Sequence, residues 1–306
     1  MSAQLKPLKH QVIVITGASS GIGLATAEAA AKRGAKLVLA SRSDQTLNNL
    51  AERITEAGGA AVAVHCDVTQ SEQVNSLAER AIDCFGRIDT WINNAGLGIH
   101  GRLDEMDIAD ARQLFEVNLW GVVYGSLAAL PHLKANGGAL INVGSEVSEA
   151  SAPLLGIYTA SKHAVKGFTD ALRIEIEVID RAPVSITLIQ PTAVNTPFPE
   201  HSRNYMPQEP KLPSPLIEPE AVAEAILRAA TRPTRSKKVG LKSVLNTTVA
   251  TLLPGIGDSM AAREAGRMQY DEPPRNANGI LRQSSEAYGT AGRTHGAGGR
   301  TKAANP

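Results

Sequence analysis

The sequence has little of what a secreted, membrane-spanning or nucleic-acid-binding protein needs. Its 306 residues include only two cysteines, Cys66 and Cys84, which is too few for a disulfide framework and typical of a reducing compartment. The formal net charge is +1 and no long basic block occurs, so nothing favours a nucleic-acid partner. The first apolar run, 12–16, ends in glycine and is too short for a signal peptide or a membrane span. We therefore expect a cytoplasmic protein.

What the chain does have is an alternation of apolar, β-branched runs with amphipathic helical patterns. Several runs are apolar on both faces, as strands of a covered parallel sheet must be. The expected strands are Val12–Thr16, Lys36–Ala40, Ala61–Cys66, Ile88–Asn93, Ala139–Val143 and Val184–Ile189. The expected helices between them are Gly23–Arg33, Gln45–Ala57, Ser71–Phe85, 107–135 and 157–180. This order predicts an α/β fold with a Rossmann-type, doubly wound parallel sheet and right-handed crossovers.

The regular alternation ends after Ile189. Residues 190–219 contain eight prolines, which exclude a central strand and disfavour a long helix. A further helix is expected over Glu220–Arg232 and a short edge strand over Lys237–Leu241. From Asp271 onward large apolar residues are almost absent, so this part cannot bury enough surface to order itself. We expect a single Rossmann-fold domain over 8–240, a C-terminal helical extension over 241–271 and a flexible tail over 272–306.

Three glycines mark the turn between the first strand and the first helix. Gly17, Gly21 and Gly23 stand in the stretch TGASSGIG, with the spacing G-x-x-x-G-x-G. Where Cβ atoms are missing, backbone N–H groups can close on a pyrophosphate, and the N-terminus of the helix adds positive potential. The alternative is a tight strand–helix turn that holds no ligand. The strand before the turn and the helix after it favour a dinucleotide site.

Tyr158 and Lys162 stand four residues apart in an expected helix. Positions i and i+4 share one helix face, so the phenol and the ammonium can point into one cleft. Because a nearby cation favours phenolate, we expect Lys162 to lower the pKa of Tyr158 from its usual value near ~10. Such a phenol can give or take a proton near neutral pH. The alternative is a packing tyrosine followed by a solvated lysine.

Two further polar residues are candidates for the same site. Ser145 ends an expected strand, where a serine is often only a cap, and Ser148 is a nearby competitor. The separation of thirteen residues from Tyr158 favours Ser145. Asn118 lies within an expected helix, between two apolar residues, where asparagine is a poor helix former. From these residues alone, a structural hydrogen bond and a catalytic duty are equally open for Asn118.

Six motifs follow one another along the chain: TGASSGIG at 16–23, CDVT at 66–69, NNAG at 93–96, VNLWG at 117–121, INVGS at 141–145 and YTASK at 158–162. In this order they resemble the motifs of the short-chain dehydrogenase/reductase family, and the similarity covers about residues 10–232. The resemblance implies an enzyme that reduces or oxidises a carbonyl/alcohol pair with NAD(P). It assigns proton transfer at the substrate oxygen to Tyr158. To Lys162 it assigns a lowering of the Tyr158 pKa and a hydrogen bond to the nicotinamide ribose. It implies that Ser145 holds the substrate carbonyl and that Asn118 helps to position the water that relays protons to Lys162.

The resemblance also implies a set of cofactor-binding residues, and no metal. The backbone around Asn94 lines the adenosine side, Asp67 caps the adenine, and Val68 packs nearby. The full expected set is Gly17, Ser19, Ser20, Gly21, Ile22, Gly23, Ser41, Arg42, Asp67, Val68, Asn94, Ala95, Gly96, Tyr158, Lys162, Pro191 and Thr196.

The end of the second strand bears on which dinucleotide binds. NAD-preferring members typically place an acidic residue there for the ribose 2′-hydroxyl, whereas this chain has Ser41 followed by Arg42. A guanidinium suits a 2′-phosphate, which a carboxylate would repel. The alternative is a solvated arginine at the start of a loop. We therefore expect NADP(H) to be favoured over NAD(H).

The chain departs from the family pattern in two places. The usual Pro-Gly after the sixth strand is Pro191-Thr192, so the backbone beside the nicotinamide must tolerate a β-branched residue. The usual short ending is replaced by a longer one, with amphipathic stretches over Val244–Leu253 and Ile256–Met268. We favour a packing of these stretches on the domain as a roof over the substrate cleft. The alternative is a surface for a membrane or a partner protein, with three lysines between 237 and 242 nearby.

The loop over 192–217 follows the sixth strand at the carboxyl edge of the sheet, where open α/β folds bind ligands. It carries Phe198, Tyr205, Met206 and Leu212, and residues 97–103 are expected to face it across the cleft. The loop can close as a lid, and its apolar residues predict a substrate with a sizeable apolar body.

Together these features predict an NADP(H)-dependent oxidoreductase that interconverts a carbonyl and a secondary alcohol, with Tyr158 as proton donor or acceptor. A small-molecule substrate and a homo-oligomer are expected. Two alternatives are a non-catalytic NADPH-binding regulator, against which the intact Ser–Tyr–Lys–Asn set argues, and a lipid carbonyl reductase at a membrane surface.

Overall fold

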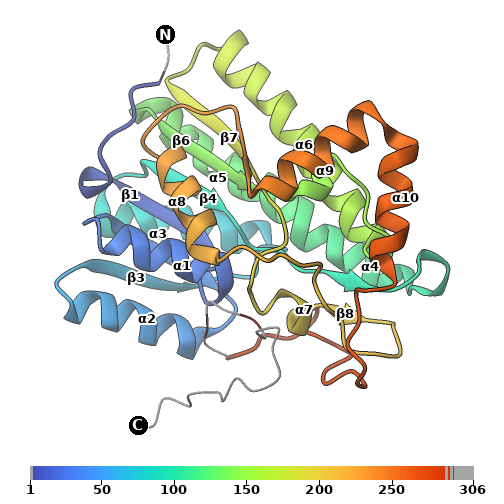
Figure 1. The fold of residues 1–306 in the computed structure, drawn as a ribbon. Helices are drawn as coiled ribbons and strands as arrows, with labels where there is room; N and C mark the ends of the chain where they lie inside the picture. The colour runs from blue at the N-terminus through green and yellow to red at the C-terminus, as the bar shows by residue number, and fades with distance from the viewer. Residues whose placement is uncertain (1–2, 287–288, 290–291, 293–306) are drawn as a thin grey trace.

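One sheet of parallel strands forms the centre of the molecule (Figure 1). The computed structural model describes residues 3–286, 289 and 292. The seven strands run in the order β3-β2-β1-β4-β6-β7-β9, so the chain builds outward from β1 on one side and then crosses to β4 to build outward on the other. They are β1 (Val12–Thr16), β2 (Lys36–Ser41), β3 (Ala60–His65), β4 (Thr90–Asn93), β6 (Gly138–Val143), β7 (Val184–Pro191) and β9 (Ser236–Val239). The predicted doubly wound sheet is confirmed, and its crossover between β1 and β4 is where such sheets bind ligands.

Helices cover both faces of the sheet, and the alternation of side chains along β1 explains why. Ile13 and Ile15 belong to an apolar cluster with α1 (Gly21–Ala31), α2 (Asp44–Glu56) and α8 (Pro219–Ala229). Val12 and Val14 point the other way, into a cluster with α3 (Ser71–Phe85), α5 (Gly121–Asn136) and α6 (Gly156–Arg173). Every residue of β1 is buried, as expected for a run that is apolar on both faces.

Two long helices expected from the sequence contain π-helical turns, one in the middle of its stretch and one at the end. The stretch 107–135 contains α4 (Ile108–Phe115), the π turn η3 (Glu116–Trp120) and then α5. The stretch 157–180 contains α6 and the π turn η5 (Ile174–Ile179). By length and composition the run Ile108–Asn136 could cross a membrane, but half of its apolar window is buried, as in the core helix of a globular domain. π turns inside helices often accompany functional sites.

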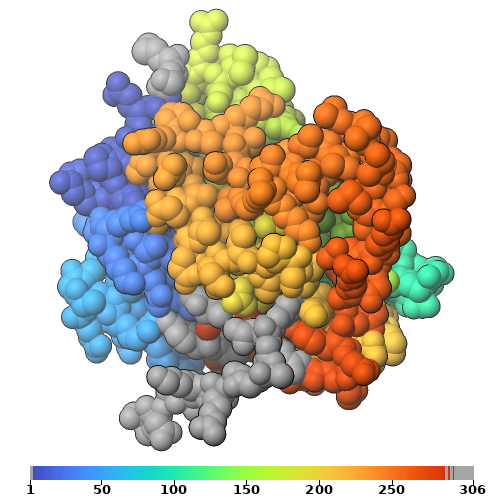
Figure 2. Space-filling view, in the orientation of Figure 1, coloured from blue at the N-terminus to red at the C-terminus, as the bar shows by residue number. Residues whose placement is uncertain are grey.

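The proline-rich stretch after β7 folds over the carboxyl edge of the sheet. It contains the short helix α7 (Phe198–His201) and the strand β8 (Arg203–Asn204), which pairs with β5 (Ile99–His100). After the edge strand β9, α9 (Leu241–Leu252) and α10 (Pro254–Ala265) pack against each other. In Figure 2 these two helices, in orange, cover one side of the molecule, and green residues are visible in a hollow between them. Short 3-10 turns complete the elements: η1 (Leu8–His10), η2 (Leu103–Glu105) and η4 (Glu146–Ser148).

The C-terminal segment differs from the flexible tail expected over 272–306. Within residues 272–286, Leu281 is 2% exposed and Arg282 pairs with Asp110 at 2.8 Å. Hydrogen bonds also join Glu286 to Thr46. The composition of residues 272–286 predicts disorder because the segment buries little apolar surface of its own. In the structure it is held by polar bonds to the domain instead. Residues 287–288, 290–291 and 293–306 of the predicted tail lie outside the described residues.

Candidate active site

A cleft of about 520 Å³ lies at the carboxyl edge of the sheet, where β1, β2, β4, β6 and β7 end. At one end, called the glycine end below, it is lined by residues of the turn after β1 together with residues 41–43 and 66–68. At the other, called the tyrosine end, it is lined by Ser145, Tyr158, the loop after β7 and the helices α9 and α10. One cavity therefore joins the two motifs that the sequence singled out.

The turn after β1 is shaped by glycines and held in place by Asn94. Gly17 has a φ of +67°, and a Cβ atom there would lie 2.8 Å from the Cα atom of Ala95. A Cβ atom on Gly23 would lie 2.0 Å from the carbonyl oxygen of Gly17, so both positions require glycine. The side-chain amide of Asn94 donates to the carbonyl oxygens of Thr16 and Gly17, both at 3.1 Å. The N-terminus of α1 is thereby fixed at the cleft, where its dipole suits a phosphate.

The structure brings almost the whole predicted cofactor-binding set to this cleft. Every member of the set lines it except Gly23, which lies behind the turn and packs on Gly17. At the glycine end, the carboxylate of Asp67 accepts a hydrogen bond from the Thr69 N–H at 3.0 Å, which fixes its orientation.

Arg42 is not the solvated arginine that the sequence left open as an alternative. One terminal nitrogen of its guanidinium donates to the carbonyl oxygen of Ile280 at 2.7 Å and approaches that of Gln283 at 3.4 Å. The side chain lines the cleft after β2, next to Ser41, which is 8% exposed. A positive charge therefore stands at the glycine end, held by the C-terminal segment.

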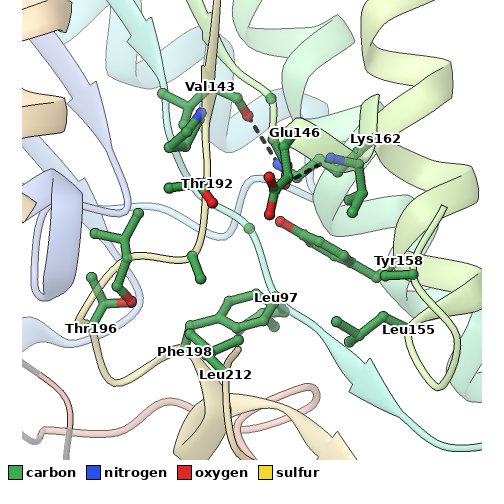
Figure 3. A pocket seen from close by; sticks show the side chains of 18 of the residues that line it. Leu97, Val143, Glu146, Leu155, Tyr158, Lys162, Thr192, Thr196, Phe198 and Leu212 are labelled. Carbon is green, nitrogen blue, oxygen red and sulfur yellow. Dashed lines mark hydrogen bonds between the residues drawn. The ribbon is translucent and has the colours of Figure 1, made fainter. Parts of the chain in front are cut away.

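Tyr158 and Lys162 lie on the first turns of α6 and form one wall of the tyrosine end (Figure 3). The Lys162 ammonium donates to the carbonyl oxygen of Val143 at 2.9 Å and lies 5.7 Å from the centre of the Tyr158 ring. The Phe198 ring packs on the opposite side, with its centre 5.2 Å from that of Tyr158. The predicted i and i+4 pair thus shares one face and one cleft.

Burial sets the pKa values of this pair, and for the tyrosine it opposes the expected direction. Burial raises the pKa of Tyr158 to about 12, although a hydrogen bond with Ser145 acts the other way. Burial lowers the pKa of Lys162 to about 8, because the ammonium loses hydration. The expected lowering of the Tyr158 pKa is therefore wrong for this structure, since removal from water and the nearby Glu146 carboxylate outweigh the hydrogen bond with Ser145. The phenol is protonated at neutral pH.

Ser145, rather than its competitor Ser148, reaches the cleft. Ser145 caps the turn η4, where its hydroxyl accepts from the Val147 N–H at 3.3 Å. The hydroxyl of Ser148 turns back to accept from the N–H of Ser145 at 3.2 Å, and Ser148 is only 1% exposed. This reciprocal capping fixes Ser145 beside Tyr158.

Asn118, on the π turn η3, is fully buried and hydrogen-bonded on both sides of its amide. Its Oδ1 accepts from the Leu97 N–H at 2.8 Å, and its Nδ2 donates to the Leu97 carbonyl at 2.9 Å and to the Ser161 hydroxyl at 3.0 Å. These bonds fit the structural interpretation, because they hold the segment after β4 against α6. The positioning of a water by Asn118 stays a prediction.

Thr192 stands where the family pattern has glycine, and the structure makes room for it elsewhere. A Cβ atom on Gly240 would lie 2.6 Å from the methyl group of Thr192, and Gly240 has a φ of +91°. The missing side chain at Gly240 therefore compensates for the extra bulk at Thr192. Pro191 and Thr196, on either side, both line the cleft as predicted for the cofactor contacts.

Glu146 lies in the tyrosine end and was not predicted. Its side chain is 9% exposed, and its carboxylate lies next to the Tyr158 hydroxyl in Figure 3. Asn246 of α9 donates to it at 3.1 Å, and burial raises its pKa. The signal available in the sequence was its position directly after Ser145, but a glutamate in the first turn of a helix ordinarily faces water.

The two C-terminal helices form the roof over the tyrosine end that we favoured from the sequence. Residues of both helices line the cleft, among them Lys242, Asn246, Val249, Met260 and Glu264. Lys242 and Glu264 join α9 to α10 at 3.5 Å. The roof therefore encloses a polar group of side chains next to apolar ones.

The proline-rich loop supplies only part of the expected apolar wall. Phe198 and Leu212 line the cleft, and Leu97 faces them from the segment after β4. Tyr205 instead donates its hydroxyl to Asp110 at 2.8 Å. Met206 is buried without lining the cleft.

These groups fit a nicotinamide dinucleotide. The cleft presents a guanidinium and a carboxylate at the glycine end, a helix N-terminus at the turn, and an ammonium with a phenol at the tyrosine end. A ligand with two nucleoside ends joined by a pyrophosphate matches this order of groups.

Comparison with known proteins agrees with this site. The family model described as short chain dehydrogenase matches residues 11–206. The uncharacterized oxidoreductase YxnA of Bacillus subtilis is 42% identical over 276 residues, which cover 89% of this chain and 77% of that protein. The 11-beta-hydroxysteroid dehydrogenase A of Sesamum indicum is 34% identical over 233 residues, covering 72% of this chain and 66% of that protein.

Solved structures show the same architecture. A short-chain dehydrogenase/reductase of Burkholderia phymatum in complex with NAD has a TM-score of 0.73 at 26% identity, covering 89% of this chain and 99% of its own. A short-chain dehydrogenase of Burkholderia cenocepacia in complex with NADP has a TM-score of 0.71 at 28% identity, covering 84% of this chain and 99% of its own. An alcohol dehydrogenase of Thermococcus sibiricus complexed with 5-hydroxy-NADP has a TM-score of 0.66 at 31% identity, covering 75% of this chain and 94% of its own.

The family model covers more than half of the chain, and the glycine and Tyr-x-x-x-Lys motifs meet in one cleft. This chain therefore belongs to the short-chain dehydrogenase/reductase family and is an oxidoreductase that acts on CH–OH groups with a nicotinamide cofactor.

Proposed function

We propose that this enzyme interconverts a carbonyl and a secondary alcohol with NADP(H), with Tyr158 as the proton donor or acceptor. The observation that carries the proposal is the placement of Ser145, Tyr158 and Lys162 on one wall of the cleft that begins at the glycine turn. The nicotinamide of the cofactor supplies or accepts the hydride when it is bound. The protein has to orient the carbonyl and handle the proton.

Each residue of the wall has its own task in carbonyl reduction. The Ser145 hydroxyl, fixed by the turn η4, donates a hydrogen bond to the substrate oxygen. Tyr158 gives its proton to that oxygen as negative charge develops there, and its raised pKa of about 12 keeps the proton available until then. Lys162, held 2.9 Å from the Val143 carbonyl, then stabilises the phenolate by its charge. In alcohol oxidation the same groups act in reverse.

Arg42 supports the preference for NADP(H). Its guanidinium lines the glycine end, and only one of its terminal nitrogens donates to the C-terminal segment among the bonds described. The remaining N–H groups suit a 2′-phosphate, which accepts charge-assisted hydrogen bonds.

Replacement of Arg42 with alanine is expected to weaken the binding of NADPH far more than the binding of NADH. A hydrogen bond to a charged group contributes about 1.5–3 kcal/mol, so the ratio of the two dissociation constants should shift about tenfold or more. Fluorescence titration of both cofactors measures it, with the exposed Arg80 of α3 replaced by alanine as the control. Equal losses for the two cofactors would leave Arg42 a structural role only, and a wild-type preference for NADH would reject the proposal.

The walls of the tyrosine end support a substrate with an apolar body. Leu97, Leu155, Phe198 and Leu212 surround the Tyr158 ring in Figure 3, and Val249 and Met260 of the roof complete the lining. The loop that carries Phe198 and Leu212 is tied to the domain by short pairings only, such as that of β8 with β5, so it can move when a substrate enters.

Protease protection of residues 192–217 is expected to rise when NADPH and a hydrophobic ketone are added together. The reason is that closure of this loop over both molecules would remove its backbone from the protease. Limited proteolysis followed by mass spectrometry measures the change, with cleavage near the turn at 57–59 as the internal control. A preference for small, charged substrates would contradict the apolar assignment.

Two further expectations belong to this proposal. Exposed apolar side chains on η3, α5 and η5, such as Trp120, Leu127 and Val178, favour a homo-oligomer, and a cytoplasmic location fits the reduced cysteines.

Exposed Leu241, Leu252 and Ile256 on the roof favour a second candidate, a lipid carbonyl reductase at a membrane surface. Flotation with liposomes separates this candidate from the first.

Oxidation of NADPH by the purified protein, measured against a panel of ketones and aldehydes, tests the proposed function. We expect turnover on apolar ketones. Binding of NADPH without turnover on any member of the panel would instead favour a non-catalytic NADPH-binding regulator.

A further inference from the structure

Residues 280–286, called the strap below, run from α7 to α2 along the outside of the glycine end. Figure 1 shows this part of the chain, in red, passing beneath α7 toward the side where α2 lies. At its start the Ile280 N–H donates to the His201 carbonyl at 2.9 Å, and Leu281 is 2% exposed. Arg282 then pairs with Asp110 of α4 at 2.8 Å. The first half of the strap is thus anchored on the substrate side of the cleft.

The second half of the strap is anchored on the N-terminus of α2. The Ser43 hydroxyl donates to the Ser285 carbonyl at 2.6 Å. The carboxylate of Glu286 accepts from both the N–H and the hydroxyl of Thr46, each at 2.9 Å. Ser43, the residue before α2, offers no side-chain cap of its own, so Glu286 supplies one, and its charge suits the positive end of the helix dipole.

Between these anchors the strap forms a wall of the cleft. Ile280 and Ser284 line the same cavity as Gly17 and Asp67 at the glycine end. The carbonyl groups of Ile280 and Gln283 hold the guanidinium of Arg42 there, at 2.7 and 3.4 Å. Beyond the strap the chain meets the glycine turn again, where the Gly21 N–H donates to the Gly289 carbonyl at 3.0 Å.

We propose that the strap is a part of the cofactor site, which closes over the adenosine end of the dinucleotide and positions Arg42. The inference rests on the binding of a nicotinamide dinucleotide in this cleft. The strap lies outside residues 11–206, which the family model matches. One anchor lies on α7 and α4 and the other on α2, so a dinucleotide that enters between these elements would pass the strap.

The strap is held in a way that allows it to open. One buried leucine and a few polar bonds hold the strap. The free-energy cost of detaching such a segment is much smaller than the cost of opening the sheet. Exchange of the cofactor is therefore limited by detachment of the strap from α2, and weaker anchoring should speed the release of NADPH.

Two variants test the strap in the full-length protein, with NADPH and NADH as probes. Glu286→Ala removes the carboxylate that caps α2, which weakens this anchor, and is expected to raise the dissociation rate of NADPH about tenfold, the effect of one charge-assisted hydrogen bond. Glu52→Ala, an exposed glutamate on the same helix, is the matched control and should leave the rate unchanged. An unchanged rate in Glu286→Ala would overturn the proposal.

A cysteine pair tests closure directly. In the double variant Thr46→Cys/Glu286→Cys, a disulfide should trap NADPH that was bound before oxidation and block NADPH added afterwards, and a reductant should reverse both effects. The native Cys66 lines the cleft, but burial raises its pKa to about 12, so it stays a thiol. Free exchange of NADPH past the closed disulfide, or a pair that never closes, would contradict the proposal. Failure of the wild-type protein to bind either cofactor would instead contradict the proposed function.

Discussion

Replacement of Tyr158 with phenylalanine is expected to lower turnover by ~10²–10⁴-fold, the usual contribution of general acid catalysis, while NADPH affinity stays nearly unchanged. The two effects separate because only the hydroxyl is lost. The ring keeps its contact with Phe198, whose centre lies 5.2 Å away, so the wall of the cleft keeps its shape. Steady-state rates on an apolar ketone and a fluorescence titration with NADPH measure the two quantities.

A second tyrosine provides the matched control. Tyr124 on α5 stacks on Trp120 with ring centres 6.0 Å apart and does not line the cleft, so Tyr124→Phe should keep full activity. Full activity in the Tyr158 variant would remove Tyr158 from the mechanism. A large loss of NADPH affinity in that variant would show that the hydroxyl serves binding rather than proton transfer.

Replacement of Lys162 with methionine is expected to damage both turnover and cofactor binding. Turnover should fall about 10²-fold or more, because the phenolate of Tyr158 loses the charge that stabilises it. Affinity for NADPH should fall about tenfold, because the ammonium is also expected to bond the nicotinamide ribose. Parallel measurements of kcat and of the NADPH dissociation constant separate the two tasks.

The protein should tolerate this substitution. The ammonium of Lys162 is buried, its pKa is lowered to about 8 by the loss of hydration, and a methionine of similar length fills the same space without that penalty. Lys166, one turn further along α6, pairs with Asp170 at 2.6 Å, and Lys166→Met should leave activity unchanged. A Lys162 variant with wild-type affinity for NADPH would show that the expected contact with the ribose is wrong.

The alternation of strands and helices was predictable because each element has its own local signal. The run Val12–Thr16 reads as a strand that is apolar on both faces, and it forms β1 with every residue buried. Gly86 marks the end of α3, where it adopts a φ of +75°. The π turns were not predictable, because one extra residue in a helical turn hardly changes the pattern of apolar side chains.

The composition of the site could also be read from the sequence, but its energetics could not. The Tyr-x-x-x-Lys spacing places both side chains on one face of α6, whatever surrounds them. The direction of the Tyr158 pKa depends on how completely the side chain is removed from water, which is decided by Phe198 and the other segments that pack around the ring. In the same way, the sequence could not choose between the two roles of Asn118, since its partners Leu97 and Ser161 come from separate segments.

Contacts between distant parts of the chain account for the largest difference from expectation. Arg42 and Ile280 are 238 residues apart, and no local pattern links them. The segment around Ile280 reads as disordered because it is polar and rich in small residues, yet its carbonyl groups and Glu286 bond to the domain. Composition describes what a segment can bury by itself, and says nothing about the partners that a folded domain offers it.

Transfer of deuterium from labelled NADPH tests the proposed reaction most directly. NADPH that carries deuterium at the reactive carbon of its nicotinamide is incubated with the enzyme and an apolar ketone, and the product is analysed by mass spectrometry. We expect one deuterium on the carbinol carbon of the alcohol with the wild-type protein, and almost no product with Tyr158→Phe. Alcohol formed without the label, or NADPH consumed without any alcohol, would contradict hydride transfer between the nicotinamide and a carbonyl carbon in this cleft.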